Sequence, residues 1–328
     1  MIASEFELID EYFTWPQSDD DVELGIGDDA AVLKTNGSLV ACADTLVAGV
    51  HFSEDMSPEA IGWKALAVNL SDCAAMGARP RWFTLCLSLP DIDTHWLQGF
   101  SAGLRRCAEA FGVSLVGGDT TRGPLSITIN AFGDLSSDGV LCRSTAQIGQ
   151  LIGVTGSLGR AAYCLNRWRI TQTHPSDDNR LWWPEPRIEE GQLLAGIASA
   201  AIDVSDGLMG DLLHVLKQSQ VAAQIHVDRL PLGEQASLEQ GLAGGEDYEL
   251  VFTLDVKQLP YLTQQWASRS LAPFTIIGEI VPWDARCDSD RLQLCRDGVP
   301  IQPGFAEGQS ADGEGCGHAY GKGYDHFS

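Results

Sequence analysis

The sequence has few basic residues for its length. Its 328 residues include 21 Lys and Arg against 45 Asp and Glu, which gives a formal net charge of −24. A protein that binds nucleic acid needs the opposite balance, because much of its affinity comes from neutralising phosphates. An anionic membrane surface would repel this chain for the same reason. The sequence therefore predicts that neither nucleic acid nor a membrane is a partner.

Long apolar runs and clustered cysteines are missing as well. No stretch reaches the roughly 18 apolar residues that a transmembrane helix needs. The nine cysteines are dispersed, without a C-x-x-C pair and without the Cys/His spacing of a zinc site. Scattered cysteines of this kind are typical of a reducing compartment. We therefore expect a cytoplasmic protein.

The common nucleotide-binding signatures are also absent. Neither the P-loop G-x-x-x-x-G-K-[ST] nor the set of protein-kinase motifs occurs. Residues 25–30, GIGDDA, match the dinucleotide fingerprint G-x-G-x-x-A, but that fingerprint needs a strand before it and a helix after it. The preceding run, DDDVEL, is a poor strand, and the residues that follow suggest a hairpin. Because Asp28 and Asp29 would also repel a pyrophosphate, dinucleotide binding is disfavoured.

Aspartates recur at the edges of apolar segments, often beside glycine. Mg²⁺ prefers hard oxygen ligands and is usually held by a few carboxylates together with substrate phosphates. Because carboxylates alone would repel ATP, metal ions must bridge the two. Glycines let phosphates approach backbone N–H groups closely. The aspartates that predict such a site are Asp28, Asp29, Asp44, Asp72, Asp119, Asp203 and Asp206.

Each of these aspartates has a structural alternative when taken alone. Asp206 could cap a helix, and Asp28 and Asp29 could be ordinary turn residues. Asp72 is harder to explain structurally, because it lies inside the apolar helical run AVNLSDCAAM, where an unpaired carboxylate is costly. His51, which closely follows Asp44, is the one histidine that remains a site candidate. The prediction of a metal and ATP site rests on the number of these aspartates.

Helix and strand patterns occur in both halves of the chain. Residues 136–150 are polar and lack periodicity, which predicts two domains, 1–140 and 150–328. Each half contains adjacent strand patterns together with helices, and one of these helices is expected at 206–219. This arrangement predicts an α/β (α+β) protein whose two domains are each a mixed β-sheet with helices on one face.

Eight segments, spread in order over nearly the whole chain, form a set of motifs. They are SEFELI (4–9), GIGDDAAVL (25–33), ADTLVAGVHF (43–52), WKALAVNLSDCAAMGARP (63–80), LVGGDTTRGP (115–124), IDVSDGL (202–208), GGEDYEL (244–250) and GYDHF (323–327). Together they resemble the thiamine-monophosphate kinases, a family in the superfamily of aminoimidazole ribonucleotide synthetase, selenophosphate synthetase and the hydrogenase-maturation dehydratase. GVHF and GGEDYEL point to the thiamine-phosphate branch.

The resemblance implies direct transfer of the ATP γ-phosphoryl group to thiamine monophosphate, assisted by several Mg²⁺ ions, in a homodimer assembled through the N-terminal domain. It also implies the fold of aminoimidazole ribonucleotide synthetase. The implied metal ligands are Asp29, Asp44, Asp72, Asp119, Asp203 and Asp206. The implied ATP contacts are Gly118, Asp119, Arg143 and Ser205, and the implied thiamine-monophosphate contacts are His51, Glu246 and Tyr324. An acceptor phosphate is already ionised, so no catalytic base is expected.

The sequence departs from the family pattern at two places. Cys42 and Ala43 stand where the family usually has Ser or Thr before the aspartate, and a Gly-rich insertion occupies residues 304–323. Two alternatives stay open, namely another ATP-using branch of the superfamily and a non-catalytic nucleotide- or metal-binding protein. The first is disfavoured because no cysteine precedes Cys42, as selenophosphate synthesis needs, and because the sequence ends GYDHFS without a terminal acceptor cysteine. The second alternative, a non-catalytic binding protein, is tested by ADP release, which it would not show when thiamine monophosphate is added.

Overall fold

A computed structural model gives the fold of most of the chain. It describes residues 5–16, 19–27, 30–35, 37–53, 55–135, 139–171, 180–284 and 291–301. Two predicted site residues, Asp29 and Tyr324, lie outside these ranges, as do Asp28 and the Gly-rich segment 304–323. Across the described ranges, no helix combines the length and the apolar character that crossing a membrane requires.

The chain divides into two compact units, each described by itself. Unit 1 comprises Met1–Val140 and Trp182–Gln192, and unit 2 comprises Leu141–Leu181 and Leu193–Ser328. The division differs from a simple cut near residue 140, because the segment Trp182–Gln192 joins unit 1. Trp63 accounts for this placement. Its indole N–H donates to the Pro184 carbonyl at 2.8 Å, and the Trp183 ring packs edge-on against its ring at 5.8 Å.

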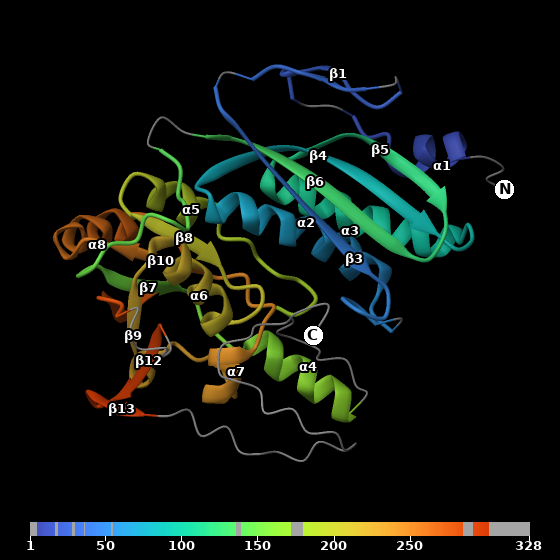
Figure 1. The fold of residues 1–328 in the computed structure, drawn as a ribbon. Coiled ribbons are helices and arrows are strands. Elements are labelled where there is room, and N and C mark those ends of the chain that lie inside the picture. The colour runs from blue at the N-terminus through green and yellow to red at the C-terminus, as the bar shows by residue number, and fades with distance from the viewer. Residues whose placement is uncertain are drawn as a thin grey trace. The chain divides into compact units, whose positions relative to one another are not determined.

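Unit 1 is built on a four-stranded mixed sheet (Figure 1). In spatial order its strands are β3 (Leu39–Val47), β6 (Ser126–Leu135), β4 (Ala78–Leu89) and β5 (Ser114–Arg122). The first two pairings are antiparallel and the β4–β5 pairing is parallel, with helix α3 (Thr94–Phe111) as the crossover. Strands β3 and β5 are therefore the two edges of this sheet.

Helix α2 (Pro58–Ala75) covers one face of the sheet, and α3 packs on α2 (Figure 1). The two helix backbones come very close, since a Cβ atom on Gly103 would lie 1.8 Å from the Glu59 carbonyl oxygen. Along β4, Leu85 and Leu87 are buried, whereas Thr84 and Cys86 are only partly buried. This alternation shows one face packed on helices and one more open face.

The GIGDDA motif lies between two short antiparallel strands, β1 (Val22–Leu24) and β2 (Val32–Leu33). The expectation that the preceding run would be a poor strand was wrong, because β1 forms there. However, β2 and not a helix follows, so the arrangement that dinucleotide binding requires is not present. Helix α1 (Glu5–Tyr12) precedes this hairpin in the chain.

Unit 2 contains a seven-stranded mixed sheet in the order β13-β12-β9-β11-β7-β10-β8. Of the described pairings in this sheet, only β12–β9 is parallel. The strands are β7 (Leu151–Thr155), β8 (Ala200–Asp203), β9 (Ala222–His226), β10 (Leu250–Leu254), β11 (Phe274–Val281), β12 (Leu292–Arg296) and β13 (Val299–Ile301). The helices are α4 (Arg160–Thr171), α6 (Leu208–Ser219), α7 (Leu238–Ala243) and α8 (Leu259–Ala267), with short 3₁₀ turns η1 (Val227–Arg229) and η2 (Val256–Gln258). Helix α5 (Ile188–Ala195) begins in the unit 1 segment Trp182–Gln192 and ends in unit 2. Mixed sheets with packed helices confirm the predicted fold class.

The two faces of the unit 2 sheet bury different helices. Val251 of β10 belongs to a core cluster that also contains Leu212 of α6. The next residue, Phe252, points to the opposite face, where Gly153 leaves room for its ring. Phe274 contacts both Phe252 and Trp266 of α8. Helix α6 therefore packs on one face, and α8 packs on the other. The expectation of helices on one face only was therefore wrong for unit 2, because both faces of this sheet carry apolar residues that a helix must cover.

Candidate functional site

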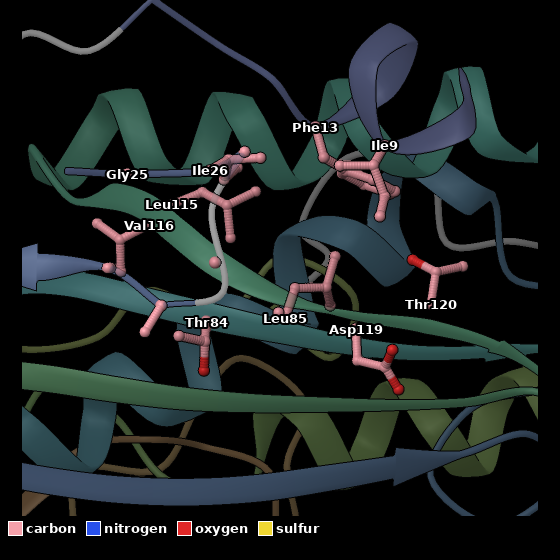
Figure 2. Close-up of a pocket in the computed structure, with 15 residues that line it drawn as sticks. Ile9, Phe13, Gly25, Ile26, Thr84, Leu85, Leu115, Val116, Asp119 and Thr120 are labelled. Carbon is pink, nitrogen blue, oxygen red and sulfur yellow. The ribbon is translucent and has the colours of Figure 1, made fainter. Parts of the chain in front are cut away.

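A cavity lies at the β5 edge of the unit 1 sheet. Its volume is about 590 Å³, within the usual range for small-molecule sites. Figure 2 shows Ile9 of α1 and Phe13, which directly follows this helix, on one side and Thr84 and Asp119 on the strands. The lining residues are Ile9, Phe13, Gly25, Ile26, Gly27, Ala30, Ala31, Thr84, Leu85, Leu115, Val116, Gly117, Gly118, Asp119 and Thr120. The cavity thus combines an apolar part with a glycine-rich part beside the Asp119 carboxylate.

Gly118 is required by the shape of this strand. Its φ is +151°, and a Cβ atom there would lie 1.8 Å from the Leu85 carbonyl oxygen. Only glycine fits both constraints. Gly118 therefore lets β5 lie close against β4 and leaves its backbone accessible beside Asp119. Both residues are predicted ATP contacts, and both line the cavity.

Asp44 and Asp72 come together at the other edge of the sheet, between β3 and α2. The Asp44 N–H donates to the Asn69 side-chain oxygen at 3.0 Å, which ties β3 to the helix. The pKa of the nearby Cys42 thiol is raised strongly by its hydrogen bond with Cys73 and by burial, and the negative charges of Asp72 and Asp44 add to this. Two predicted metal ligands thus share one electrostatic environment.

Asp44 and Asp119 do not come together within one chain. The sheet register aligns Asp44 with Ile129, Ile129 with Leu85, and Leu85 with Gly118. Asp119 lies in the next row, across three strand spacings from Asp44. At about 4.8 Å per spacing, the two backbones are roughly 14 Å apart. Two carboxylates this far apart cannot bind the same ion directly.

His51 lies in a turn that follows β3. Its Nδ1 accepts the Val47 N–H at 3.0 Å, which orients the imidazole ring. The buried Lys64 of α2 donates from Nζ to the His51 carbonyl oxygen at 3.4 Å. A buried ammonium group therefore lies beside the one histidine that the sequence retained as a site residue.

In unit 2, four predicted site residues lie in two adjoining segments. Asp203 is the buried last residue of β8, and Ser205 and Asp206 follow it. The Glu246 N–H donates to the Ser205 carbonyl at 2.8 Å, and the Tyr248 N–H donates to the Val204 carbonyl at 2.9 Å. The structure therefore brings Asp203, Ser205, Asp206 and Glu246 together.

Helix α6 begins at Leu208, two residues later than expected, and its N-cap is Gly207. Capping of this helix was the structural explanation considered for Asp206, but Asp206 is not the cap. Asp211 caps the helix from inside its first turn, because its carboxylate accepts the N–H groups of Asp206 and Gly207 at 3.0 and 3.1 Å. The first turn of α6 is therefore capped by Asp211 and not by Asp206.

Asp211 is a site residue that the sequence did not reveal. Burial raises its pKa to about 8, and the charges of Asp203 and Asp206 contribute. A buried carboxyl group close to two other carboxylates favours a cation nearby. An aspartate in the first turn of an amphipathic helix resembles an ordinary helix-start residue, so its sequence gave no separate signal.

Arg143 is exposed, and it lies near the side of α6 that carries His214. Burial lowers the pKa of His214, and the positive charges of Arg143 and Lys217 lower it further, against the opposing effect of Asp206. Arg143 and Asp206 therefore act on the same imidazole.

In the GGEDYEL segment, two side chains lie on a strained backbone and two others anchor that backbone. Glu246 and Tyr248 have φ values of +72° and +50°, an uncommon conformation for side chains of this size, and their side chains lie 3.4 Å apart. Asp247 instead accepts the Gly159 N–H at 2.6 Å at the start of α4, and burial raises its pKa to about 7. Glu249 is fully buried and accepts from Thr155 and Arg180. Asp247 and Glu249 thus hold the strained segment that presents Glu246.

In both units the candidate metal ligands are carboxylate oxygens. Among the described residues, no three His, Cys, Asp or Glu side chains converge closely enough to hold an ion unaided. Paired or clustered carboxylates that lack a third converging ligand fit a hard divalent cation that takes its remaining ligands from a phosphate substrate. The residues present therefore suit a cation that bridges the protein and a phosphate.

Known proteins are similar to this chain in sequence and in fold. Residues 27–135 match the family described as AIR synthase related protein, N-terminal domain. The thiamine-monophosphate kinase of Haemophilus influenzae is 41% identical over 324 residues, which cover 94% of this chain and 98% of that protein. The crystal structure of thiamine-monophosphate kinase from Stenotrophomonas maltophilia is 41% identical, with a TM-score of 0.78 over 87% of this chain and 93% of that one.

A further solved structure, AaThiL complexed with AMPPCP and TMP, is 28% identical, with a TM-score of 0.70 over 85% of this chain and 90% of that one. Similarity at this level extends through both units, since it is not limited to the residues that match the AIR synthase family. The full-length similarity at about 41% identity decides the assignment. The chain belongs to the thiamine-monophosphate kinase family.

Proposed function

We propose that this chain transfers the γ-phosphoryl group of ATP to thiamine monophosphate, giving thiamine diphosphate and ADP. The observation that carries this proposal is the cavity at Gly118 and Asp119, which pairs an apolar wall with an accessible glycine backbone and a carboxylate. An apolar wall suits a purine ring, and exposed N–H groups suit phosphates. The similar protein AaThiL has been solved with AMPPCP, a non-hydrolysable ATP analogue, and TMP.

The chemistry needs no catalytic base. The acceptor is itself a phosphate, so catalysis reduces to positioning the two phosphates and neutralising their charge. Bound Mg²⁺ would supply that neutralisation. In our proposal Asp29, Asp44, Asp72, Asp119, Asp203 and Asp206 hold the ions, and Gly118, Asp119, Arg143 and Ser205 contact ATP. A cytoplasmic location, which the dispersed free cysteines support, belongs to the same proposal.

We assign thiamine monophosphate to His51, Glu246 and Tyr324. The thiazolium ring carries a positive charge, which a carboxylate such as Glu246 can balance. The strained backbone at Glu246 supports this role, because strain of this kind is concentrated at ligand-binding positions. His51 is oriented by Val47 and lies beside the Lys64 ammonium group, which suits contact with the phosphate of the substrate.

The experiment that tests the function measures ADP release from ATP and Mg²⁺ with and without thiamine monophosphate. We expect ADP to appear only with thiamine monophosphate and in equal amounts to thiamine diphosphate. Equal ADP release without the acceptor would point to another ATP-using branch of the superfamily. ATP binding without any ADP release would point to a nucleotide-binding protein that has no catalytic activity.

Glu246→Ala is expected to raise the KM for thiamine monophosphate about tenfold or more, because it removes a charge-assisted contact worth roughly 1.5–3 kcal/mol. The KM for ATP should change little. Steady-state kinetics with each substrate varied in turn measure this. The matched control is Glu239→Ala, an exposed glutamate on α7, which should leave both constants unchanged. A change confined to the KM for ATP would remove Glu246 from the thiamine-monophosphate site.

We further propose that the enzyme is a homodimer with sites shared between protomers. The separation of Asp44 from Asp119 supports this, because both are proposed ligands but they lie at opposite sheet edges. A second copy could place its β5 edge beside the β3 edge of the first. The open sheet face, with its polar Thr84 and Asn130 side chains hydrogen-bonded to each other, suits a surface that meets another copy.

Mixing two inactive variants tests the shared site. Asp44→Asn and Asp119→Asn should each be inactive alone, yet a mixture dissociated and reassembled should regain activity, because one site of each mixed dimer then contains both native aspartates. Turnover of thiamine monophosphate, with the unmixed variants as controls, measures this. If each protomer forms its own site, every site in the mixture lacks one of the two aspartates, and no activity returns.

A further inference from the structure

The base of the β1–β2 hairpin is held by a single arginine of β4. The Arg81 guanidinium donates to Asp19 at 2.9 and 3.0 Å, to Asp21 at 2.8 Å and to Asp134 of β6 at 2.8 Å. Its side chain is only 15% exposed. Three carboxylates thus surround one cation in a largely buried position, where charge-assisted hydrogen bonds are strong and the loss of one partner is costly.

Other contacts join both ends of the hairpin to this point. The Trp82 indole N–H donates to Asp19 at 3.0 Å, and the Asp21 N–H donates to the Asp19 carboxylate at 3.0 Å. The Asp21 carbonyl oxygen accepts the Lys34 N–H at 2.8 Å, directly after β2. The residues before β1 and after β2 are therefore fixed together at Arg81.

Within the described part of the chain, strands β1 and β2 pair only with each other. Yet Gly25, Gly27 and Ala30 of this hairpin line the cavity that also contains Gly118 and Asp119 of β5. Arg81 itself does not line that cavity. The distance between the two cavity walls thus depends on the place where the hairpin is anchored.

We propose that Arg81 is a positioning residue for nucleotide binding, which holds the β1–β2 hairpin at the right distance from β5. The inference rests on the proposed use of this cavity for ATP. Removal of the guanidinium leaves Asp19, Asp21 and Asp134 facing one another without a counter-charge. Their repulsion moves the hairpin away from β4 and opens the cavity, while His51 and Glu246, which are not part of this network, keep their places.

The test compares Arg81→Gln and Arg81→Lys with the control Arg122→Gln, whose ion pair with Asp91 is 82% exposed on both sides. The readouts are the Kd for AMPPCP with Mg²⁺, the KM for each substrate and the Tm. We expect Arg81→Gln to raise the Kd for AMPPCP and the KM for ATP about tenfold or more, with the KM for thiamine monophosphate within about twofold. Arg81→Lys should recover part of the affinity for AMPPCP, because lysine keeps the positive charge but cannot donate to several carboxylates at once as the planar guanidinium does.

Asp21→Asn provides a second variant that keeps Arg81 and its remaining contacts, in case Arg81→Gln does not fold. It should weaken AMPPCP binding in the same direction by a smaller factor. The proposal is overturned if folded Arg81 or Asp21 variants bind AMPPCP as tightly as the native protein, or if both KM values rise together in proportion to a lower Tm. Since AMPPCP binding needs no turnover, absence of thiamine-monophosphate kinase activity in the native protein would refute the proposed reaction and leave this test intact.

Discussion

Asp72→Asn is expected to reduce kcat at saturating ATP by about 10²–10³, while the fold stays intact. Asparagine has the shape of aspartate and keeps a carbonyl oxygen, but it removes the negative charge that a divalent cation needs. Asp72 lies on α2 beside Asp44, where both charges act on the Cys42 thiol, so its loss leaves half of this carboxylate pair. Turnover at saturating ATP and thiamine monophosphate, with a Mg²⁺ titration, measures the effect.

The control for this variant is Asp91→Asn. Asp91 has the same chemistry, but it is exposed and forms an equally exposed ion pair with Arg122, so its loss should leave kcat and the Tm nearly unchanged. Circular dichroism and thermal unfolding would show whether Asp72→Asn keeps the native fold. Native activity in a folded Asp72→Asn protein would exclude Asp72 from the metal site. Its position inside an apolar helix would then need a structural explanation.

Gly118→Ala is expected to weaken ATP binding by at least tenfold and to destabilise unit 1 by about 1–3 kcal/mol. The new Cβ atom would lie 1.8 Å from the Leu85 carbonyl oxygen, and its φ of +151° is one that alanine rarely adopts. The strand must therefore move away from β4, which displaces both the glycine backbone and Asp119 in the cavity. Calorimetric titration with AMPPCP and thermal unfolding measure the two effects.

The neighbouring glycine supplies the matched control. A Cβ atom on Gly117 would have Thr84 Cγ2 at 3.9 Å as its nearest neighbour, an ordinary van der Waals contact. Gly117→Ala should therefore leave both stability and AMPPCP affinity close to native. If the two alanine variants behaved alike, the close approach of β5 to β4 at Gly118 would not be what shapes the cavity.

The sequence by itself predicted several residues of the candidate site. It marked Gly118, Asp119 and the aspartates that follow apolar strands, because the residue types that phosphates and hard cations require are few. It predicted mixed sheets with packed helices from strand and helix periodicity. It did not reveal Arg81 or Asp211, since an arginine in a strand and an aspartate in a first helical turn resemble ordinary surface and capping residues until their partners are known.

The family and the kind of chemistry were thus determined by the sequence alone, because they depend on which residues occur and in what order. Only the tertiary structure decided which of those residues meet. Strand register placed Asp44 and Asp119 at opposite edges of one sheet, and long-range contacts placed Arg81 beneath the hairpin. Strand pairing and packing join residues tens of positions apart, so no local pattern encodes these distances.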